Sequence, residues 1–281
     1  MTHPSPQAPI GIFDSGVGGL SVLRHIRAQL PHEHLLYFAD AGFAPYGDKP
    51  EKVVAERALA IAEFLVARGA KALVVACNTA TVAAIKLLRA HYPAMPIVGV
   101  EPGLKPAAAA TRNGKVGVMA TEGTLAGEKF QLLHQQIGAA GAVEFLLQGC
   151  PGLADQIELG QADSPAIAAM LERFVLPLIE QGADTLVLGC THYPFALEAI
   201  EAIIARSGRQ IALIDTGDAV ARHLARLLAG ASVLNGDTEA ARLQAYTSGS
   251  AGDLAGKFAA LLGLEPAVLE VSLAGKTSTS A

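Results

Sequence analysis

Two cysteines each follow a short apolar segment that is typical of a buried strand. The segment LVLGCTHYPF covers residues 186–195 and contains Cys190, and the segment LVVACNTA covers residues 73–80 and contains Cys77. A thiolate can take up a proton and a thiol can give one. Two thiols facing one carbon atom from opposite sides could therefore invert a stereocentre without a cofactor, with their roles exchanged in the reverse direction.

The chemistry of a free thiol sets the cost of this reaction. A thiol with a pKa of about 8.5 is only a few per cent ionised at pH 7, so forming the thiolate costs roughly 2 kcal/mol. Free backbone N–H groups at a strand-to-helix turn can reduce that cost. The third cysteine, Cys150, has no counterpart segment, so we interpret it as a small packing residue. None of the 3 cysteines lies in CxxC or Cys/His ligand spacing, and we predict no metal site.

The composition indicates a compact α/β protein with reduced thiols. The chain has 281 residues, of which 51% are hydrophobic and only 5% aromatic, enough for one large or two medium domains. The net charge is −5 and no cluster of Lys and Arg occurs, which argues against nucleic acid or a membrane surface as a partner. The start of the chain lacks the pattern of a secretory signal, and we expect a cytoplasmic protein.

Apolar segments alternate with segments whose apolar residues recur every three or four positions. This alternation predicts parallel sheets covered by helices on both faces. In the helical segment 50–70, the charged residues of EKVVAER (51–57) are expected to form solvated surface. The first nine residues and the final AGKTSTSA are expected to fray. The predicted strands cover residues 10–13, 35–39, 72–76, 96–100, 115–119, 185–189 and 211–215.

The two cysteine segments belong to an internal similarity between two halves of the chain. Each cysteine comes eight residues after the glycine of a Gly-Ala pair, at Gly69 and Gly182. Two further pairs of segments match in the same order: 10–20 with 116–125, and 97–103 with 211–217.

This similarity predicts an α/β fold of two similar, pseudo-symmetric domains, each a mainly parallel sheet flanked by helices. We assign residues 1–99 plus 212–281 to the first domain and residues 100–211 to the second. Ligands of such sheets bind at the carboxyl ends of the strands. If the domains face each other, both thiols reach the cleft between them, where we expect the active site.

Five motifs together carry a resemblance to a known family. They are FDSGVGGLSVLR (13–24), DAGFAPYG (40–47), ACNTA (76–80), GVEPG (99–103) and GCTHYP (189–194). From Ile10 to about Val220 the chain resembles the glutamate racemases, cofactor-independent enzymes that make D-glutamate for bacterial peptidoglycan. The glycines of DSGVGGLS fit neither common nucleotide-binding pattern, which agrees with the absence of a cofactor that the resemblance implies.

The resemblance also implies roles for individual residues. Cys190 would serve the L face of the substrate and Cys77 the D face, with Asp14 and His192 assisting proton transfer. Asp40 either caps the loop that it begins or supports the site. Glu158 matches a family acidic residue, but its surroundings are less hydrophobic than usual, so its role stays open. The implied substrate-binding residues are Asp14, Ser15, Pro45, Tyr46, Gly47, Asn78, Thr79, Thr121, Thr191 and His192.

Two other classes of function stay open at this point. One is a related enzyme, such as an aspartate racemase or a single-thiol decarboxylase, and the other is a module that binds an amino acid without catalysis. The PYG loop within the motif set favours glutamate over aspartate, and two equivalent thiols argue against the decarboxylase. The resemblance also implies a homodimer, because homodimers occur in the family.

Overall fold

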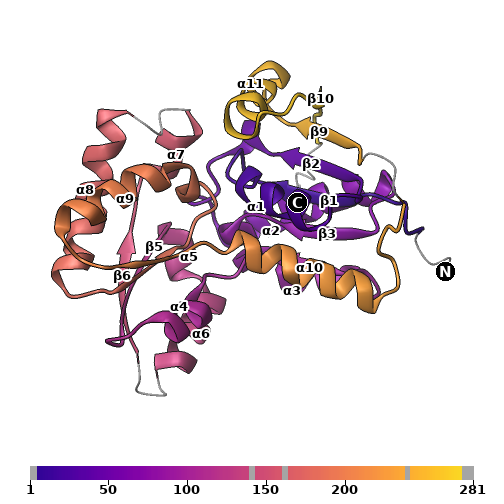
Figure 1. Cartoon of the computed structure of the whole chain (residues 1–281). Coiled ribbons are helices and arrows are strands. Elements are labelled where there is room, and N and C mark those ends of the chain that lie inside the picture. The colour runs from indigo at the N-terminus through magenta and orange to yellow at the C-terminus, as the bar shows by residue number, and fades with distance from the viewer. Residues whose placement is uncertain (1–4, 139–142, 160–163, 238–240, 274–281) are drawn as a thin grey trace, which may run out of the picture.

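The computed structural model describes residues 5–138, 143–159, 164–237 and 241–273 of the chain. Two parallel sheets with helices on both faces make up the molecule (Figure 1). The predicted α/β class is thereby confirmed. Of the ends that were expected to fray, residues 1–4 and 274–281 lie outside the described residues, whereas Pro6 is held by the side chain of Lys71.

The larger sheet has six strands in the order β10-β9-β2-β1-β3-β4, and all neighbours are parallel. The segments predicted as the first four strands form β1 to β4. The sequence patterns do not predict β9 and β10, which come from the C-terminal part of the chain. The strands are β1 (Ile10–Asp14), β2 (Leu35–Ala39), β3 (Ala72–Val75), β4 (Ile97–Gly99), β9 (Leu243–Thr247) and β10 (Ala267–Glu270).

The smaller sheet has four parallel strands in the order β6-β5-β7-β8. They are β5 (Lys115–Ala120), β6 (Glu144–Gly149), β7 (Thr185–Leu188) and β8 (Ala212–Ile214). Because β8 pairs with β7, residues 212–214 belong to this sheet and not to the larger one. A domain boundary drawn from sheet membership therefore falls after Ile214, three residues later than the division made from the sequence. The assignment of domains itself stays a prediction.

Helices cover both faces of each sheet because successive residues of a strand point to opposite sides. In β1, Ile12 packs with Leu23 of α1 and Leu224 of α10, whereas Phe13 belongs to the core formed with α2 and α3 on the other face. The helices are α1 (Leu20–Gln29), α2 (Glu51–Ala67), α3 (Asn78–His91), α4 (Leu104–Ala110), α5 (Glu122–Ala126), α6 (Glu128–Gly138), α7 (Leu153–Glu158), α8 (Pro165–Glu180), α9 (Leu197–Ser207), α10 (Gly217–Gly230) and α11 (Ala251–Leu262), with short 3-10 turns at Ala41–Phe43 (η1) and Tyr193–Ala196 (η2).

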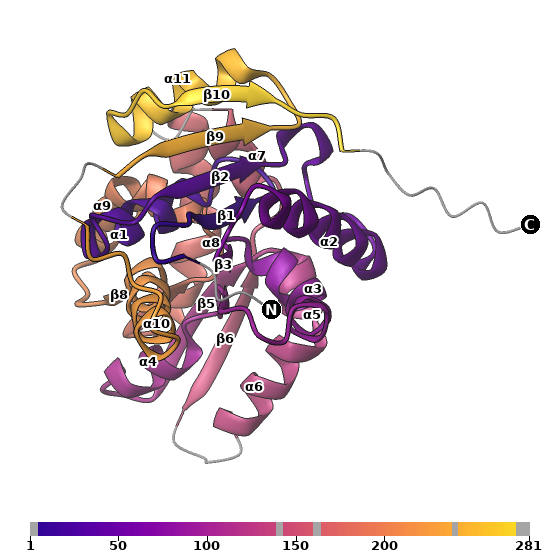
Figure 2. The ribbon, with the colours of Figure 1, turned by 90° about the vertical axis from the view of Figure 1, so that its right-hand side faces the viewer.

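The chain passes between the two sheets twice among these elements. It leaves the larger sheet after β4 and returns after β8 through α10, which packs against α1 (Figure 2). Within the described residues, no helix is long and apolar enough to cross a membrane.

Candidate active site

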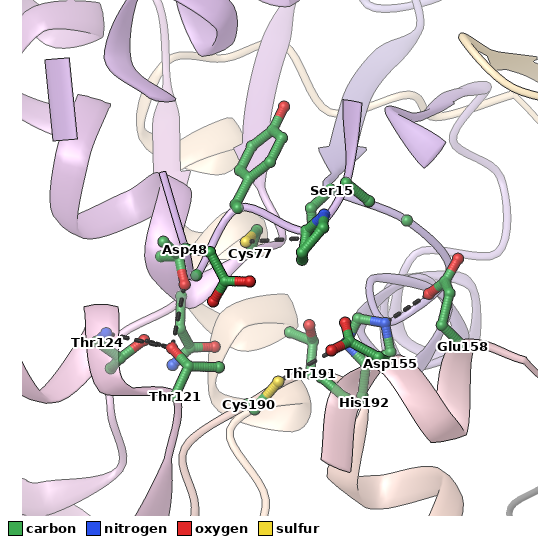
Figure 3. Close-up of a pocket in the computed structure, with 18 of the residues that line it drawn as sticks. Ser15, Asp48, Cys77, Thr121, Thr124, Asp155, Glu158, Cys190, Thr191 and His192 are labelled. Carbon is green, nitrogen blue, oxygen red and sulfur yellow. Dashed lines mark hydrogen bonds and ion pairs between the residues drawn. The ribbon is translucent and has the colours of Figure 1, made fainter. Parts of the chain in front are cut away.

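A cavity of about 230 Å³ lies between the two sheets, at the carboxyl ends of strands from both (Figure 3). Cys77 follows β3 of the larger sheet and Cys190 follows β7 of the smaller one, and Figure 3 places them on opposite sides of the cavity. Most of the other predicted site residues line it as well: Ser15, Pro45, Tyr46, Gly47, Asn78, Thr79, Thr121, Glu158, Thr191 and His192.

Cys77 occupies the position that caps the amino end of α3. Its Sγ accepts the Ala80 N–H at 3.5 Å and lies 3.8 Å from the Ser15 hydroxyl oxygen. Burial and the nearby charge of Asp14 nevertheless raise the pKa of Cys77 above its ordinary value, because the Ala80 and Ser15 contacts compensate only in part. As expected, the N–H group at the turn lowers the pKa of Cys77. Burial and the charge of Asp14 raise this pKa by more, so the net cost of forming the thiolate is higher and not lower. Before substrate binds, Cys77 is a neutral thiol and a proton donor.

Cys190 lies beside a histidine and a carboxylate. Its Sγ is 3.6 Å from Nδ1 of His192, whose Nε2 is 2.6 Å from a carboxylate oxygen of Glu158. Burial lowers the pKa of His192, but the hydrogen bonds and charges of Cys190 and Glu158 outweigh burial and hold that pKa well above its ordinary value. Burial raises the pKa of Glu158, and the contacts with His192 and the Val17 N–H more than offset it, so this pKa is lowered. The pair is therefore an imidazolium and a carboxylate near neutral pH.

The glycines of the DSGVGG segment let the two halves of the site meet. A Cβ on Gly16 would lie 2.6 Å from both carboxylate oxygens of Glu158, and one on Gly18 would lie 2.4 Å from Nδ1 of His192. The Val17 N–H also donates to Glu158, at 3.0 and 3.2 Å to its two oxygens. Glu158 thus joins α7 to the loop after β1, an arrangement that the sequence left open.

Asp14 stands behind the cavity wall and does not line it. Its side chain is fully buried, accepts the Gly16 N–H at 3.0 Å and lies 3.5 Å from the Thr191 hydroxyl. Burial raises the pKa of Asp14, and the charge of His192 and the Gly16 N–H oppose burial without cancelling it. Direct contact of Asp14 with a substrate, as the resemblance implies, does not follow from this position. Its connections to the site are its charge near Cys77 and its contact with the Thr191 hydroxyl.

Asn78 places a buried amide at the cavity. It follows Cys77 directly and is only 4% exposed, yet both polar atoms of its side chain lack a hydrogen-bond partner among the described residues. A buried amide without partners is costly unless a ligand satisfies it. Next to it, the hydroxyls of Thr79 and Thr121 lie 3.3 Å apart and connect α3 to the start of α5.

Asp40 also lies outside the cavity, fully buried below the PYG loop. One of its oxygens accepts the Tyr46 hydroxyl at 2.6 Å. The Asp40 side chain forms no capping hydrogen bond to the short turn that follows it, and its contact with the Tyr46 hydroxyl connects it to the loop that lines the cavity. Tyr46 lines the cavity, as do Pro45 and Gly47.

Several cavity residues were not predicted from the sequence. Cys150 follows β6, a strand that the patterns do not reveal, at the same edge of the sheet as Cys190. Burial raises the pKa of Cys150 to about 12, which fits a thiol that packs without reacting. Thr124 donates its backbone N–H to Thr121, a capping pattern visible in the sequence TEGT. The other unpredicted residues are Gly16, Ala44, Asp48, Glu122, Pro151, Gly152, Ala154 and Asp155.

In the part of the chain that the structure describes, no group of three or more His, Cys, Asp or Glu side chains is placed to hold a metal ion. The cavity is lined by three thiols, an imidazolium–carboxylate pair, further carboxylates, hydroxyls and an amide. Such groups can bind an amino acid and move protons at its α-carbon.

The chain is similar to enzymes of one family. A sequence model of the family described as Asp/Glu/hydantoin racemase matches residues 10–224. The glutamate racemase of Ectopseudomonas mendocina is 55% identical over 222 residues, which are 79% of this chain and 82% of that protein. A crystal structure of a glutamate racemase from Bacillus anthracis has a TM-score of 0.86 at 30% identity and covers 95% of this chain and 98% of that one. The glutamate racemase of Francisella tularensis, crystallised with D-glutamate, has a TM-score of 0.82 at 27% identity and covers 95% and 98%.

Proposed function

Because the chain belongs to the Asp/Glu/hydantoin racemase family and, within it, to the glutamate racemases, we propose that Cys77 and Cys190 exchange protons with opposite faces of the glutamate α-carbon. The reaction is the interconversion of L- and D-glutamate. The observation that carries the proposal is that two thiols from two different sheets line one cavity from opposite sides.

The two thiols have different surroundings, and these suit different roles in one direction. For L-glutamate, the Cys190 thiolate takes the α-proton and the electron pair stays on the substrate as a carbanion. The Cys77 thiol, which burial keeps protonated, then gives its proton to the other face and becomes the thiolate. The reverse reaction begins from that thiolate. Microscopic reversibility thus requires both sulfurs to act as acid and as base.

His192 and Glu158 support the Cys190 side of this exchange. An imidazolium 3.6 Å from the sulfur can hydrogen-bond the thiolate or pass it a proton. Glu158 keeps the imidazole charged and oriented through the 2.6 Å contact with Nε2. A histidine held by a carboxylate in this way is a common arrangement in proton transfer.

The remaining cavity residues bind the substrate in this proposal. Asn78 gains partners for its amide when an amino acid enters. Ser15, Thr79, Thr121 and Thr191 offer hydroxyls to the ammonium and carboxylate groups, while the loop of Pro45 to Gly47 holds a carboxylate.

The wider setting follows from the activity. D-glutamate made by this enzyme would supply peptidoglycan synthesis, a cytoplasmic process that contributes to cell-wall biogenesis and cell shape.

We also propose a homodimer in solution. Light scattering that finds only monomer at micromolar concentration with glutamate present would contradict the dimer.

The activity is tested by measuring kcat/KM for L-glutamate and L-aspartate with a chiroptical assay. We expect a clear preference for glutamate. Equal values, or a preference for aspartate, would move the chain to another specificity within the family. Carbon dioxide release would indicate the decarboxylase, and binding of glutamate without any change in optical rotation would indicate a binding module.

A further inference from the structure

The carboxylate of Asp40 is the centre of a buried hydrogen-bond cluster below the cavity. Its two oxygens together accept four hydrogen bonds, which fills the capacity of a carboxylate. The donors are the Tyr46 hydroxyl at 2.6 Å, Arg57 Nε at 2.8 Å, Arg57 Nη2 at 2.6 Å and the Ser248 hydroxyl at 2.6 Å. Asp40 is fully buried, and these four donors surround its carboxyl group.

Arg57 was expected to lie on a solvated helix face, and the structure contradicts this. Its side chain is 12% exposed and forms a forked ion pair with Asp40. Its guanidinium carbon lies 4.9 Å from the centre of the Phe43 ring, and its Nη1 donates to the carbonyl of Leu273 at 3.2 Å. Arg57 therefore connects α2 to the segment after β10. Figure 2 shows that segment passing beside the chain between β2 and α2.

The loop of residues 44–48 depends on this cluster for its place at the cavity. It contains no helix or strand, and Tyr46 is its one buried residue. Two of its hydrogen bonds are local, from the Lys49 N–H to the Tyr46 carbonyl and from Lys49 Nζ to the Pro45 carbonyl. Among the described residues, one further hydrogen bond holds the loop, from the Tyr46 hydroxyl to Asp40. Because Tyr46 lines the cavity and also contacts Asp40, a shift of the carboxylate would move the loop.

The support comes in part from beyond the segment that matches the family. Ser248 and Leu273 lie outside residues 10–224. The Ser248 hydroxyl also accepts the Gly42 N–H at 3.0 Å, and a Cβ on Gly42 would lie 2.3 Å from the Ser248 carbonyl oxygen. This close approach fixes the short turn η1, which directly precedes the loop, against the end of β9.

We propose that Arg57 is a positioning residue for the substrate: through Asp40 it holds Tyr46, and with it the loop of residues 44–48, at the cavity wall. The inference rests on the proposed function, in which this loop binds a substrate carboxylate. Lysine cannot replace arginine here, because one ammonium group cannot reach both carboxylate oxygens and the Leu273 carbonyl in the geometry of the planar fork.

The test is steady-state kinetics of Arg57→Lys with L- and D-glutamate. We expect KM to rise about tenfold while kcat stays within about threefold, since the loop binds ground state and transition state alike. Ser248→Ala, which keeps the ion pair, should shift KM in the same direction by a smaller factor. If Arg57→Lys does not fold, Tyr46→Phe tests the same connection by removing only the hydroxyl that contacts Asp40.

Glu33→Gln is the matched control. Glu33 forms an equally buried ion pair with Lys71, at the opposite end of the sheet, with exposed fractions of 2% and 0%. This variant should lower the melting temperature and leave KM unchanged. If Arg57→Lys behaves like Glu33→Gln, with lower stability but the KM of the wild type, the positioning role is refuted and Arg57 is only a structural residue.

Hydrogen exchange separates this inference from the proposed function, because it needs no turnover. In Arg57→Lys, amides of residues 41–49 should exchange faster than in the wild type, while Glu33→Gln leaves them unchanged. If the wild type failed to racemise glutamate, the proposed function would fail, and the exchange data would still decide whether Arg57 holds the loop. Unchanged exchange in Arg57→Lys would overturn the inference.

Discussion

Replacing Glu158 by glutamine removes the negative charge beside His192 and keeps a hydrogen-bonding side chain of nearly the same size. Glutamine can still accept the Val17 N–H, so the loop after β1 should keep its place. The lost contact is a charged hydrogen bond of 2.6 Å between side chains that are 8% and 25% exposed. Such a bond contributes about 1.5–3 kcal/mol. If the lost bond removes about 2 kcal/mol of transition-state stabilisation, kcat of Glu158→Gln should fall about 30-fold.

The pH dependence gives the sharper readout. In the wild type, Glu158 helps to hold the pKa of His192 well above its ordinary value. Without that charge, burial lowers the pKa of His192. If the imidazolium is the active form, activity is lost as pH rises through this pKa, so the alkaline limb of the kcat profile should move to lower pH in Glu158→Gln. Glu172→Gln is the control, because Glu172 lies in α8 and forms an exposed ion pair with Arg206. An unchanged profile with kcat within about threefold of the wild type would refute the role of the pair.

The same pair makes stability depend on pH with a definite sign. The raised pKa of His192 stabilises the fold below its ordinary value of 6.5, and this contribution is lost as pH rises through the raised pKa. The lowered pKa of Glu158 stabilises the fold above its ordinary value of 4.5, and this contribution is lost as pH falls through the lowered pKa. Urea unfolding should therefore show the largest gap between wild type and Glu158→Gln between these two values, with a smaller gap on either side.

Two further changes test the cavity itself. Gly18→Ala would place a Cβ 2.4 Å from His192 Nδ1, so kcat/KM should fall at least about tenfold. Gly256→Ala in α11 is the control, because a Cβ there would have no neighbour within 4 Å and kcat/KM should not change. Equal activity of both variants would contradict the close approach at Gly18. Cys77→Ser and Cys190→Ser should each lower kcat by about 10³-fold or more with substrate binding retained, because a serine hydroxyl hardly ionises near neutral pH, while Cys150→Ser should be nearly silent. Near-normal turnover in either of the first two would end the two-thiol mechanism.

The sequence predicts those parts of the fold whose pattern is local. Every apolar segment assigned as a strand became one, since a buried parallel strand is marked by its own residues. The placement of Cys77 and Cys190 at one cavity follows from the strand ends together with the expectation that the two domains face each other. Strands β6, β9 and β10 were missed because they are only partly buried, and Glu, Gln or Thr interrupts or flanks the apolar residues of EFLLQG, LQAYT and AVLE.

The supporting contacts of the site could not be predicted, because each joins segments far apart in the chain. Glu158 of α7 contacts Gly16 and Val17 in the loop after β1 of the other sheet. No residue pattern in either segment indicates this contact. Arg57 has the helical spacing of a surface residue, and only the buried Asp40 below the loop explains its burial. Both depend on how the sheets and the C-terminal strands pack, which no local pattern records.

The proton exchange at two separate sulfurs is tested most directly by a single turnover of L-glutamate in deuterated solvent. Before the reaction the Cys77 thiol carries solvent deuterium, and the Cys190 thiolate of the proposed mechanism carries none. If Cys190 removes the α-proton and Cys77 delivers the replacement, the D-glutamate of the first turnover carries deuterium at Cα, and L-glutamate that has not yet reacted keeps its hydrogen. Substantial transfer of the original hydrogen into D-glutamate would mean that one group acts on both faces, and would contradict the account.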